Sequence, residues 1–325
     1  MANFYGQYIG YGGGGETTPA LAGWYGTRGV VMAGYFPNRD TIDYITIATP
    51  SATALDFGNC ITAVRGAATM GNGIGGRGMC VGGSTDSGQG NGGASSMPGL
   101  QYITFSSTGD ATYFGDLLVG AYFPCGAGND GIRGMKYGGE GGSPYYNPSI
   151  DYSTIATTGN ALDFGDAVTP GGRGSSVNDG TTSIQAGISN YPTKDINIEY
   201  VTTQTTGNAV DWGYDFTAAW INGDATSSDS GRGVFHTPDT AAGTGLVTME
   251  YITIQTPADS LDYGDLLGSA SHTIGKLSNG TRGCIAGGYP SNTAIDYFTF
   301  ASTGNGIDFG NLSVGRSMCG GISGT

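Results

Sequence analysis

The chain has 325 residues, of which 63 are glycine, and its 26 Asp and Glu against 12 Lys and Arg give a formal net charge of −14. An acidic surface repels the phosphates of nucleic acids and anionic membranes, so neither is an expected partner. The glycines lack an every-third spacing and lie between β-branched and aromatic runs, which excludes collagen and simple disorder and predicts a turn-dense β protein.

The first element is a glycine-rich arm over residues 1–17 with spaced aromatic side chains at Phe4, Tyr5, Tyr8 and Tyr11. Such a segment cannot build much core alone, whereas tyrosine provides a large contact area with a polar tip. We expect the arm to bind a neighbouring subunit; the alternative is that it folds onto the rim of its own domain. The arm lacks the basic region and apolar core of a signal peptide, and no stretch approaches a membrane-spanning length. We therefore expect synthesis in a cytoplasm and no membrane insertion.

From about residue 18 to the end, one pattern occurs six times: an acid and Tyr, a β-branched run, a turn, then an acid, an aromatic residue and Gly. Its tyrosines are Tyr44, Tyr102, Tyr152, Tyr200, Tyr251 and Tyr297, with steps of 58, 50, 48, 51 and 46 residues. A period of roughly 50 with internal strand signals is typical of a radial or stacked β architecture. Because one unit is too small to bury its own apolar face, we expect residues 18–325 to form one domain.

The last repeat shows the expected order of strands within a unit. A tight turn at residues 279–283 precedes an apolar strand at 284–289, and alternating residues predict a second strand at 295–300. Further segments follow at 307–310 and 312–318. No segment has a sustained helical period. These patterns predict an all-β fold, a six-bladed β-propeller of four-stranded antiparallel blades.

Closure of the ring leaves a choice between the two ends of the chain. The 44 residues up to Tyr44 and the 28 after Tyr297 exceed one period by about 20, which favours six blades plus a short arm. Residues 21–25 and residues 317–322 both resemble the first strand of a unit. Only one can fill the slot, so the other is expected at the outer edge or as a rudimentary extra blade with the arm.

Five of the nine arginines recur at one position, just before the glycine of the turn: Arg28, Arg77, Arg133, Arg232 and Arg282. We expect each to pair with a repeat acid or to cover an aromatic ring with its stem. The alternative is a ring of cations that binds a ligand.

The apolar strand that ends in a glycine pair, as at Val81–Gly83, Tyr137–Gly139 and Ala286–Gly288, resembles kelch repeats, which build β-propellers. The sequence of residues 150–166 is similar to the repeats of kelch-like proteins of tailed bacteriophages. This resemblance implies a virion or tail-associated protein, made in the host cytoplasm and located in the virion. Its implied partners are other virion proteins and copies of itself.

The sequence contains few patterns typical of catalytic or metal-binding sites. His236 and His272 have unrelated surroundings, and the five cysteines lack zinc-site spacing, so we expect buried free thiols. Ser84–Gly88 and Ser227–Gly231 faintly echo the Asp-box of sialidase propellers but are interpreted as turns. Acid pairs such as Asp163 and Asp166 could hold calcium, although hydrogen bonds to backbone are the favoured role. The sequence therefore predicts no enzyme activity, no cofactor and no metal.

These observations favour a non-enzymatic structural or adaptor protein of a virion that mediates protein–protein contacts. The alternative is a receptor- or carbohydrate-binding propeller for host recognition, while an enzyme resembling kelch oxidases or sialidases lacks the residues it needs. The predicted partner-binding residues are Phe4, Tyr5, Tyr8, Tyr11, Tyr145 and Tyr146. Tyr122 and Phe123 are weaker contact candidates.

Overall fold

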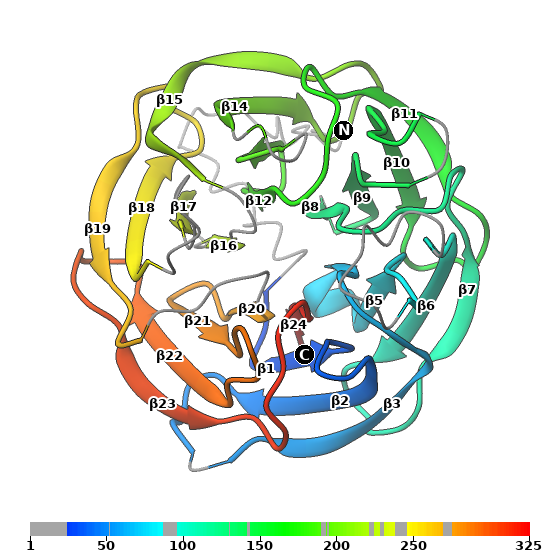
Figure 1. Ribbon diagram of the computed structural model, residues 1–325, viewed down its shortest axis with the longest axis vertical. Helices are drawn as coiled ribbons and strands as arrows, with labels where there is room; N and C mark the ends of the chain where they lie inside the picture. The colour runs from blue at the N-terminus through cyan, green and yellow to red at the C-terminus, as the bar shows by residue number, and fades with distance from the viewer. Residues whose placement is uncertain are drawn as a thin grey trace, which may run out of the picture.

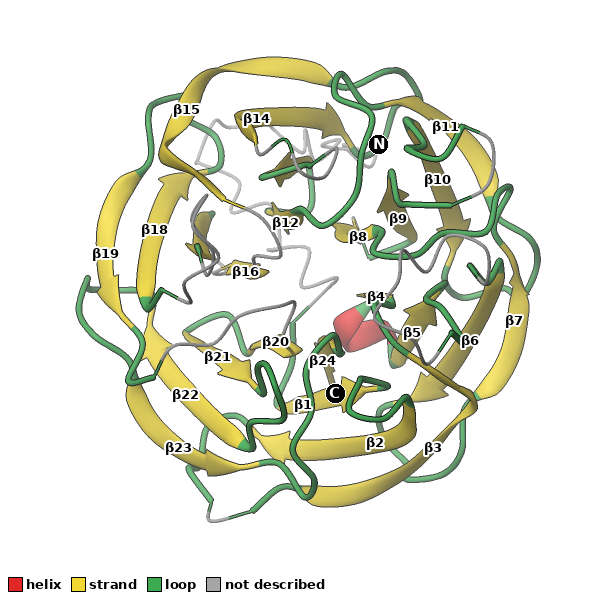
Figure 2. Ribbon diagram, viewed as in Figure 1, coloured by secondary structure: helices red, strands yellow, loops and turns green. Residues whose placement is uncertain are grey.

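The chain folds into six four-stranded antiparallel sheets around a common axis, a β-propeller (Figure 1). The computed structural model describes residues 25–51, 53–86, 96–129, 131–141, 144–189, 193, 195–220, 224–227, 231–237, 246–268 and 275–325. Within these residues the only helical element is the 3-10 turn η1 (Gly73–Gly75) (Figure 2). The predicted fold class, blade number and strand number per blade are confirmed.

Each blade runs from an inner strand at the axis to an outer strand at the circumference. Blade 1 has β24 (Gly320–Gly324), β1 (Arg28–Met32), β2 (Arg39–Thr46) and β3 (Leu55–Val64). Blade 2 has β4 (Ala68–Gly71), β5 (Arg77–Val81), β6 (Gly99–Thr104) and β7 (Thr112–Asp116). Blade 3 has β8 (Cys125–Asn129), β9 (Arg133–Tyr137), β10 (Ser149–Thr154) and β11 (Leu162–Asp166). Blade 4 has β12 (Ser175–Asn178), β13 (Thr182–Ala186), β14 (Asp195–Thr202) and β15 (Val210–Trp220). Blade 5 has β16 (Asp224–Ser227), β17 (Arg232–His236), β18 (Thr248–Thr253) and β19 (Leu261–Asp265). Blade 6 has β20 (Gly275–Ser278), β21 (Arg282–Ala286), β22 (Ala294–Thr299) and β23 (Ile307–Asn311).

The apolar core lies between neighbouring blades. Between blades 6 and 1, for example, Leu277 and Phe309 pack with Val31 and Ile47 in one buried cluster. Within every blade the repeat tyrosine meets the repeat aromatic residue edge to face, with ring centroids 5.5–6.1 Å apart. Such pairs contribute roughly 0.5–1.5 kcal/mol each beyond their buried area. The residues of the repeated pattern therefore stabilise each blade and pack it against its neighbour.

The C-terminal segment closes the ring. Strand β24 pairs with β1, from Met32 opposite Gly320 to Arg28 opposite Gly324. It therefore fills the inner slot of blade 1, while residues 21–24 and the arm at 1–17 lie outside the described residues. The expected strand over 312–318 was wrong: that segment crosses from β23 to the axis, and the strand follows at 320–324. Glycines suit this place, since a Cβ on Gly321 would lie 2.3 Å from the backbone nitrogen of Lys276.

The propeller has two different faces. Because neighbouring strands are antiparallel, the second-to-third-strand connections emerge on the same face as the crossings to the next blade. We call this the loop face. The opposite face carries the tight turns, including those that contain the repeated arginines.

Candidate functional site

The repeat acid on the third strand of each blade links that blade to the one before it. In blade 4, Glu199 accepts hydrogen bonds from the backbone N–H groups of Val168 (2.7 Å) and Thr169 (3.2 Å) of blade 3. The equivalent side chains accept from the preceding blade in the same way: Asp43 from Ser313, Gln101 from Ile61, Asp151 from Leu118, Glu250 from Thr217 and Asp296 from Leu267. All six side chains are buried. Five of the six are carboxylates, so the first acid of the repeat has a structural role, since charge-assisted hydrogen bonds are among the stronger ones.

The five repeated arginines link each blade to the one after it. Each guanidinium lies over the repeat tyrosine of its own blade, 4.2–5.1 Å from the ring centroid. Each also donates to a backbone carbonyl of the next blade, as Arg77 does to Ile155 (3.0 Å) and Arg282 does to Ile47 (2.9 Å). The prediction that they cover an aromatic ring is confirmed. A ring of ligand-binding cations is not what these residues form, because their donors are directed at protein carbonyls.

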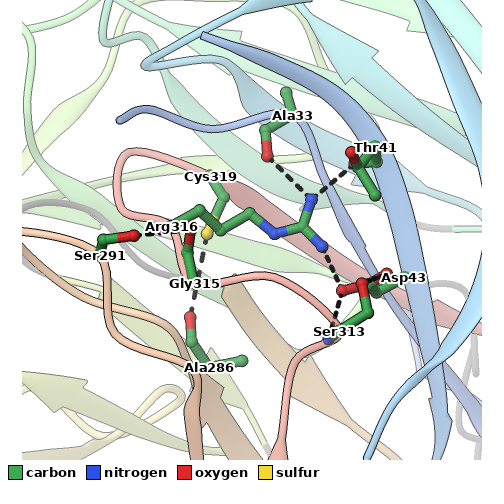
Figure 3. A network of polar contacts seen from close by, with 9 residues as sticks. All are labelled: Ala33, Thr41, Asp43, Ala286, Ser291, Ser313, Gly315, Arg316 and Cys319. Carbon is green, nitrogen blue, oxygen red and sulfur yellow. Dashed lines mark hydrogen bonds and ion pairs between the residues drawn. The ribbon is translucent and has the colours of Figure 1, made fainter. Parts of the chain in front are cut away.

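A buried ion pair joins the crossing segment to blade 1 (Figure 3). Arg316 and Asp43 form this pair with both side chains fully buried, and Arg316 also donates to the carbonyls of Ala33 (3.2 Å) and Thr41 (2.6 Å). The hydroxyl of Ser313 donates to Asp43 at 2.6 Å. The network ties the loop after β23 to β1 and β2, so we assign it to closure of the ring.

Side chains that depart from the repeat form a cluster of aromatic and arginine residues on the loop face. Arg65 is 1% exposed and lies between the rings of Tyr35 (4.6 Å to the centroid) and Tyr122 (5.3 Å). Tyr122 and Phe123 pack in one buried group with Tyr35 and Met318. Blades 1, 2 and 3 and their connections therefore contribute to one site, which we call the loop-face cluster.

An ion pair extends the loop-face cluster toward solvent. Arg173 lies 4.4 Å above the ring of Phe123, and its Nη2 donates to Glu140 at 3.1 Å. The hydroxyl of Tyr145 donates to the same carboxylate at 3.2 Å, and Tyr145 packs on Tyr146 with ring centroids 4.9 Å apart. Burial, with Glu140 adding to it, raises the pKa of Tyr145, so its hydroxyl stays protonated as a donor. The half-buried pair Tyr145–Tyr146 forms the accessible edge of the cluster.

Backbone strain also gathers at the loop-face cluster. The non-glycine residues with left-handed φ among the described residues are Ala33, Phe36, Phe123, Arg173 and Met318, with φ from +50° to +80°. All five lie in loop-face connections. Three of them, with Gly66, stand two residues before an inner strand, and the backbone N–H of Arg173 donates to Phe123, that of Phe123 to Gly66 and that of Gly66 to Met318 (2.8–2.9 Å). Strain of this kind persists where neighbours enforce it and is frequent at functional sites.

The predicted contact residues fall into two groups. Phe4, Tyr5, Tyr8 and Tyr11 lie outside the described residues. The structure brings Tyr145 and Tyr146 together with the weaker candidates Tyr122 and Phe123, although the last two are buried as the base of the cluster. Sequence reasoning missed Tyr35, Arg65, Glu140 and Arg173; the signal for them was that none belongs to the repeat.

The cysteines and histidines are the remaining candidates for a catalytic or metal-binding site. All five cysteines are free and buried, as predicted. Within the described part of the chain, no group of three or more His, Cys, Asp and Glu could hold a metal ion, and no helix could cross a membrane. His272 and the echo at 227–231 rest wholly or partly on residues that are not described. His236 is fully buried in β17, where its Nε2 lies 3.2 Å from the carbonyl of Leu246.

The burial of His236 predicts that the folded protein loses stability in acid. Burial lowers its pKa from 6.5 to about 4. The unfolded chain therefore binds the proton first, and stability that is fully present above about pH 6.5 is lost as the pH falls toward 4. The shift corresponds to about 3 kcal/mol. We expect the free energy of unfolding of the wild type, measured by denaturant titration, to fall more steeply between pH 6.5 and 4 than that of His236→Gln. Parallel pH profiles of the two proteins would contradict this assignment.

Two comparisons of the sequence with known proteins give no match. No protein-family model matches the chain, and no curated protein matches it in sequence. The fold itself is compatible with a kelch-like repeat protein. The function of this chain must therefore be inferred from its own geometry.

Proposed function

We propose that this propeller is a non-enzymatic structural or adaptor module that binds a protein partner through the loop-face cluster. The observation that carries the proposal is the contrast between two sets of polar residues. The repeated acids and arginines are engaged in links between blades. Arg65, Arg173 and the tyrosines of the loop-face cluster lie outside the repeat, and they gather instead on one face of the ring.

The chemistry of the loop-face cluster suits protein recognition. Tyrosine and arginine dominate the residues that contribute most to interface affinity. Here Arg65 and Arg173 lie against the rings of Tyr122 and Phe123. Tyr146 is half-buried, and Tyr289, which is 40% exposed, packs on Phe36 at the edge of the cluster with ring centroids 5.2 Å apart. Because these groups are already ordered in the free ring, little side-chain freedom remains to be lost on binding.

We further propose that the partner is a virion protein or another copy of this chain and that the protein resides in a tailed phage particle. Support comes from the resemblance of residues 150–166 to repeats of tailed-phage proteins and from the links between all six blades. A ring whose blades are linked to one another by hydrogen bonds suits a protein of a particle that must persist outside a cell.

Purification of particles tests this proposal. We expect quantitative mass spectrometry of gradient-purified particles to find this chain in a fixed copy number relative to the major structural proteins. Tyr146→Ala and Tyr289→Ala should reduce incorporation about 30-fold or more, as loss of an interface hot spot does. The matched control is Tyr214→Ala, which removes an exposed tyrosine from β15 and should incorporate normally. A chain that stays entirely in the soluble fraction would refute the virion assignment.

Carbohydrate recognition is a second function that we propose, for a separate surface. A notch at the circumference between blades 1 and 2 carries an exposed aromatic ring beside a side-chain amide. Screening the wild-type protein on an array of neutral and acidic glycans tests it, since a protein without this function would bind none of them.

A further inference from the structure

Blade 2 is the blade in which the repeat loses its charge. On the third strand five blades carry an acid where blade 2 carries Gln101, and on the outer strand five blades carry Asp where blade 2 carries Tyr113. The two positions face each other across the sheet: Gln101 pairs with Tyr113 as Asp296 pairs with Asp308 in blade 6. A cross-strand pair of carboxylates has thus become an uncharged amide and phenol at one place.

The exchanged pair lines a notch. The hollow between blades 1 and 2 has a volume of about 180 Å³, and its lining includes Ile61, Met97 and Pro98 besides Gln101 and Tyr113. The equivalent hollow between blades 5 and 6 has a volume of about 250 Å³ and is lined by Asp296 and Asp308. At the two exchanged positions, therefore, one hollow carries a pair of carboxylates and the other carries an amide and a phenol.

The polar groups of the notch are arranged for a ligand. Gln101 is 8% exposed; its Oε1 accepts from the N–H of Ile61 at 2.6 Å, while its Nε2 has no protein partner in the described part of the chain. This nitrogen is not among the buried polar atoms without a partner, so it is reachable from the notch and can donate to a ligand there. Tyr113 is 55% exposed, and the carboxylate of Asp116, which also lines the notch, raises the pKa of its hydroxyl.

We infer that the notch between blades 1 and 2 binds a single residue of a neutral carbohydrate. The ring of Tyr113 presents a π face, which attracts the C–H groups of a sugar, while Gln101 supplies a donor and Asp116 an acceptor for its hydroxyls. The inference rests on the second proposed function and adds the ligand class and the residues.

Other ligands fit this lining less well. An anionic sugar would meet Asp116 and a chain of net charge −14. An apolar side chain of a protein would fill the space but would cover the Gln101 amide and the Asp116 carboxylate without hydrogen bonding to them. A small, open notch also implies weak binding, with a Kd on the order of 1 mM.

The repeat itself supplies the variant for the test. Tyr113→Asp installs the residue that the other five blades carry, so the blade should fold normally while the aromatic platform is lost. Gln101→Glu replaces the amide with the acid that blades 4 and 5 carry at this position, so it removes the amide donor while the blade should still fold. The matched control is Asp163→Asn at the equivalent position of blade 3.

The experiment is saturation-transfer NMR with methyl glycosides of glucose, galactose, mannose and N-acetylglucosamine. We expect saturable binding of at least one of them, weakened at least 10-fold by Tyr113→Asp and by Gln101→Glu and unchanged by Asp163→Asn. Circular dichroism melts should show that each variant is folded.

The possible failures are distinguishable. Sugar binding that survives Tyr113→Asp would overturn this site while leaving carbohydrate recognition intact. No binding of any glycan by the wild type would overturn both. A protein partner whose binding requires Tyr113, with no sugar bound, would make the notch a protein-docking site and overturn the inference.

Discussion

Replacing Arg316 with alanine should lower the free energy of unfolding by about 3–5 kcal/mol, the usual effect of removing one partner of a buried ion pair. The carboxylate of Asp43 would remain buried without a cation, and the carbonyls of Ala33 and Thr41 would lose their donor. Urea denaturation followed by tryptophan fluorescence measures the change.

The matched control for Arg316 is Arg282→Ala. Arg282 also joins blades 6 and 1, but it is only half-buried and lies over Tyr297 at 4.2 Å. Its cation–π contact and its donation from Nη1 to the carbonyls of Ile47 and Ala48 together imply a loss of about 1–2 kcal/mol. An Arg316→Ala variant no less stable than Arg282→Ala would show that the ion pair does not stabilise closure. In a double-mutant cycle, Arg316→Met with Asp43→Asn should cost less than the sum of the single changes.

Gly321→Ala is expected to destabilise the ring by about 3 kcal/mol or more, at the upper end of what overpacking causes. The added Cβ would lie 2.3 Å from the backbone nitrogen of Lys276 and 2.7 Å from its carbonyl oxygen. Because both are main-chain atoms of the neighbouring inner strand, β20, a rotamer change cannot relieve the clash. Either β24 leaves its slot or blades 6 and 1 move apart.

Hydrogen exchange distinguishes this result from a general loss of stability. Protection should fall first for the amides of β24 and β1, which pair with each other. Gly159→Ala is the control, because Gly159 has no atom within 4 Å of an added Cβ and no left-handed φ. Its effect should stay within about 0.5 kcal/mol. Equal stability of the two variants would mean that the inner strands are not packed as tightly as the structure shows.

Much of the fold was predictable because the repeat is local. The tyrosine strand at 295–300 and the short strand at 307–310 were read from alternation and turn residues, and both occur in the structure within one residue at each end. The role of Arg282 over an aromatic ring was also predicted from its fixed place in the turn. Six repetitions of one pattern made the number of blades a matter of counting.

The closure could not be predicted in the same way. Residues 21–25 and 317–322 have the same local character, and only the pairing of β24 with β1 distinguishes them. The error over 312–318 has a related cause. The apolar residue Leu312 is buried although it lies in a crossing segment and not in a strand, so burial alone produced the pattern of a strand.

The candidate sites were less accessible to sequence reasoning. Tyr35, Arg65, Tyr122 and Arg173 stand far apart along the chain, and no spacing rule connects them. The loop-face cluster exists because the ring brings the connections of successive blades to one side of the axis. The notch likewise needs the pairing of Gln101 with Tyr113 and the neighbouring blade to close its wall.

By itself, the sequence determined which residues form strands, how many sheets there are and which side chains recur between them, because each of these depends on contacts within one or two repeats. Only the tertiary structure decided which end closes the ring, which blade each repeat acid binds and where the departures from the repeat meet. These depend on how whole blades are placed around the axis, and that placement is set by packing between segments far apart in the chain, as in the pairing of Arg28 with Gly324, 296 residues away.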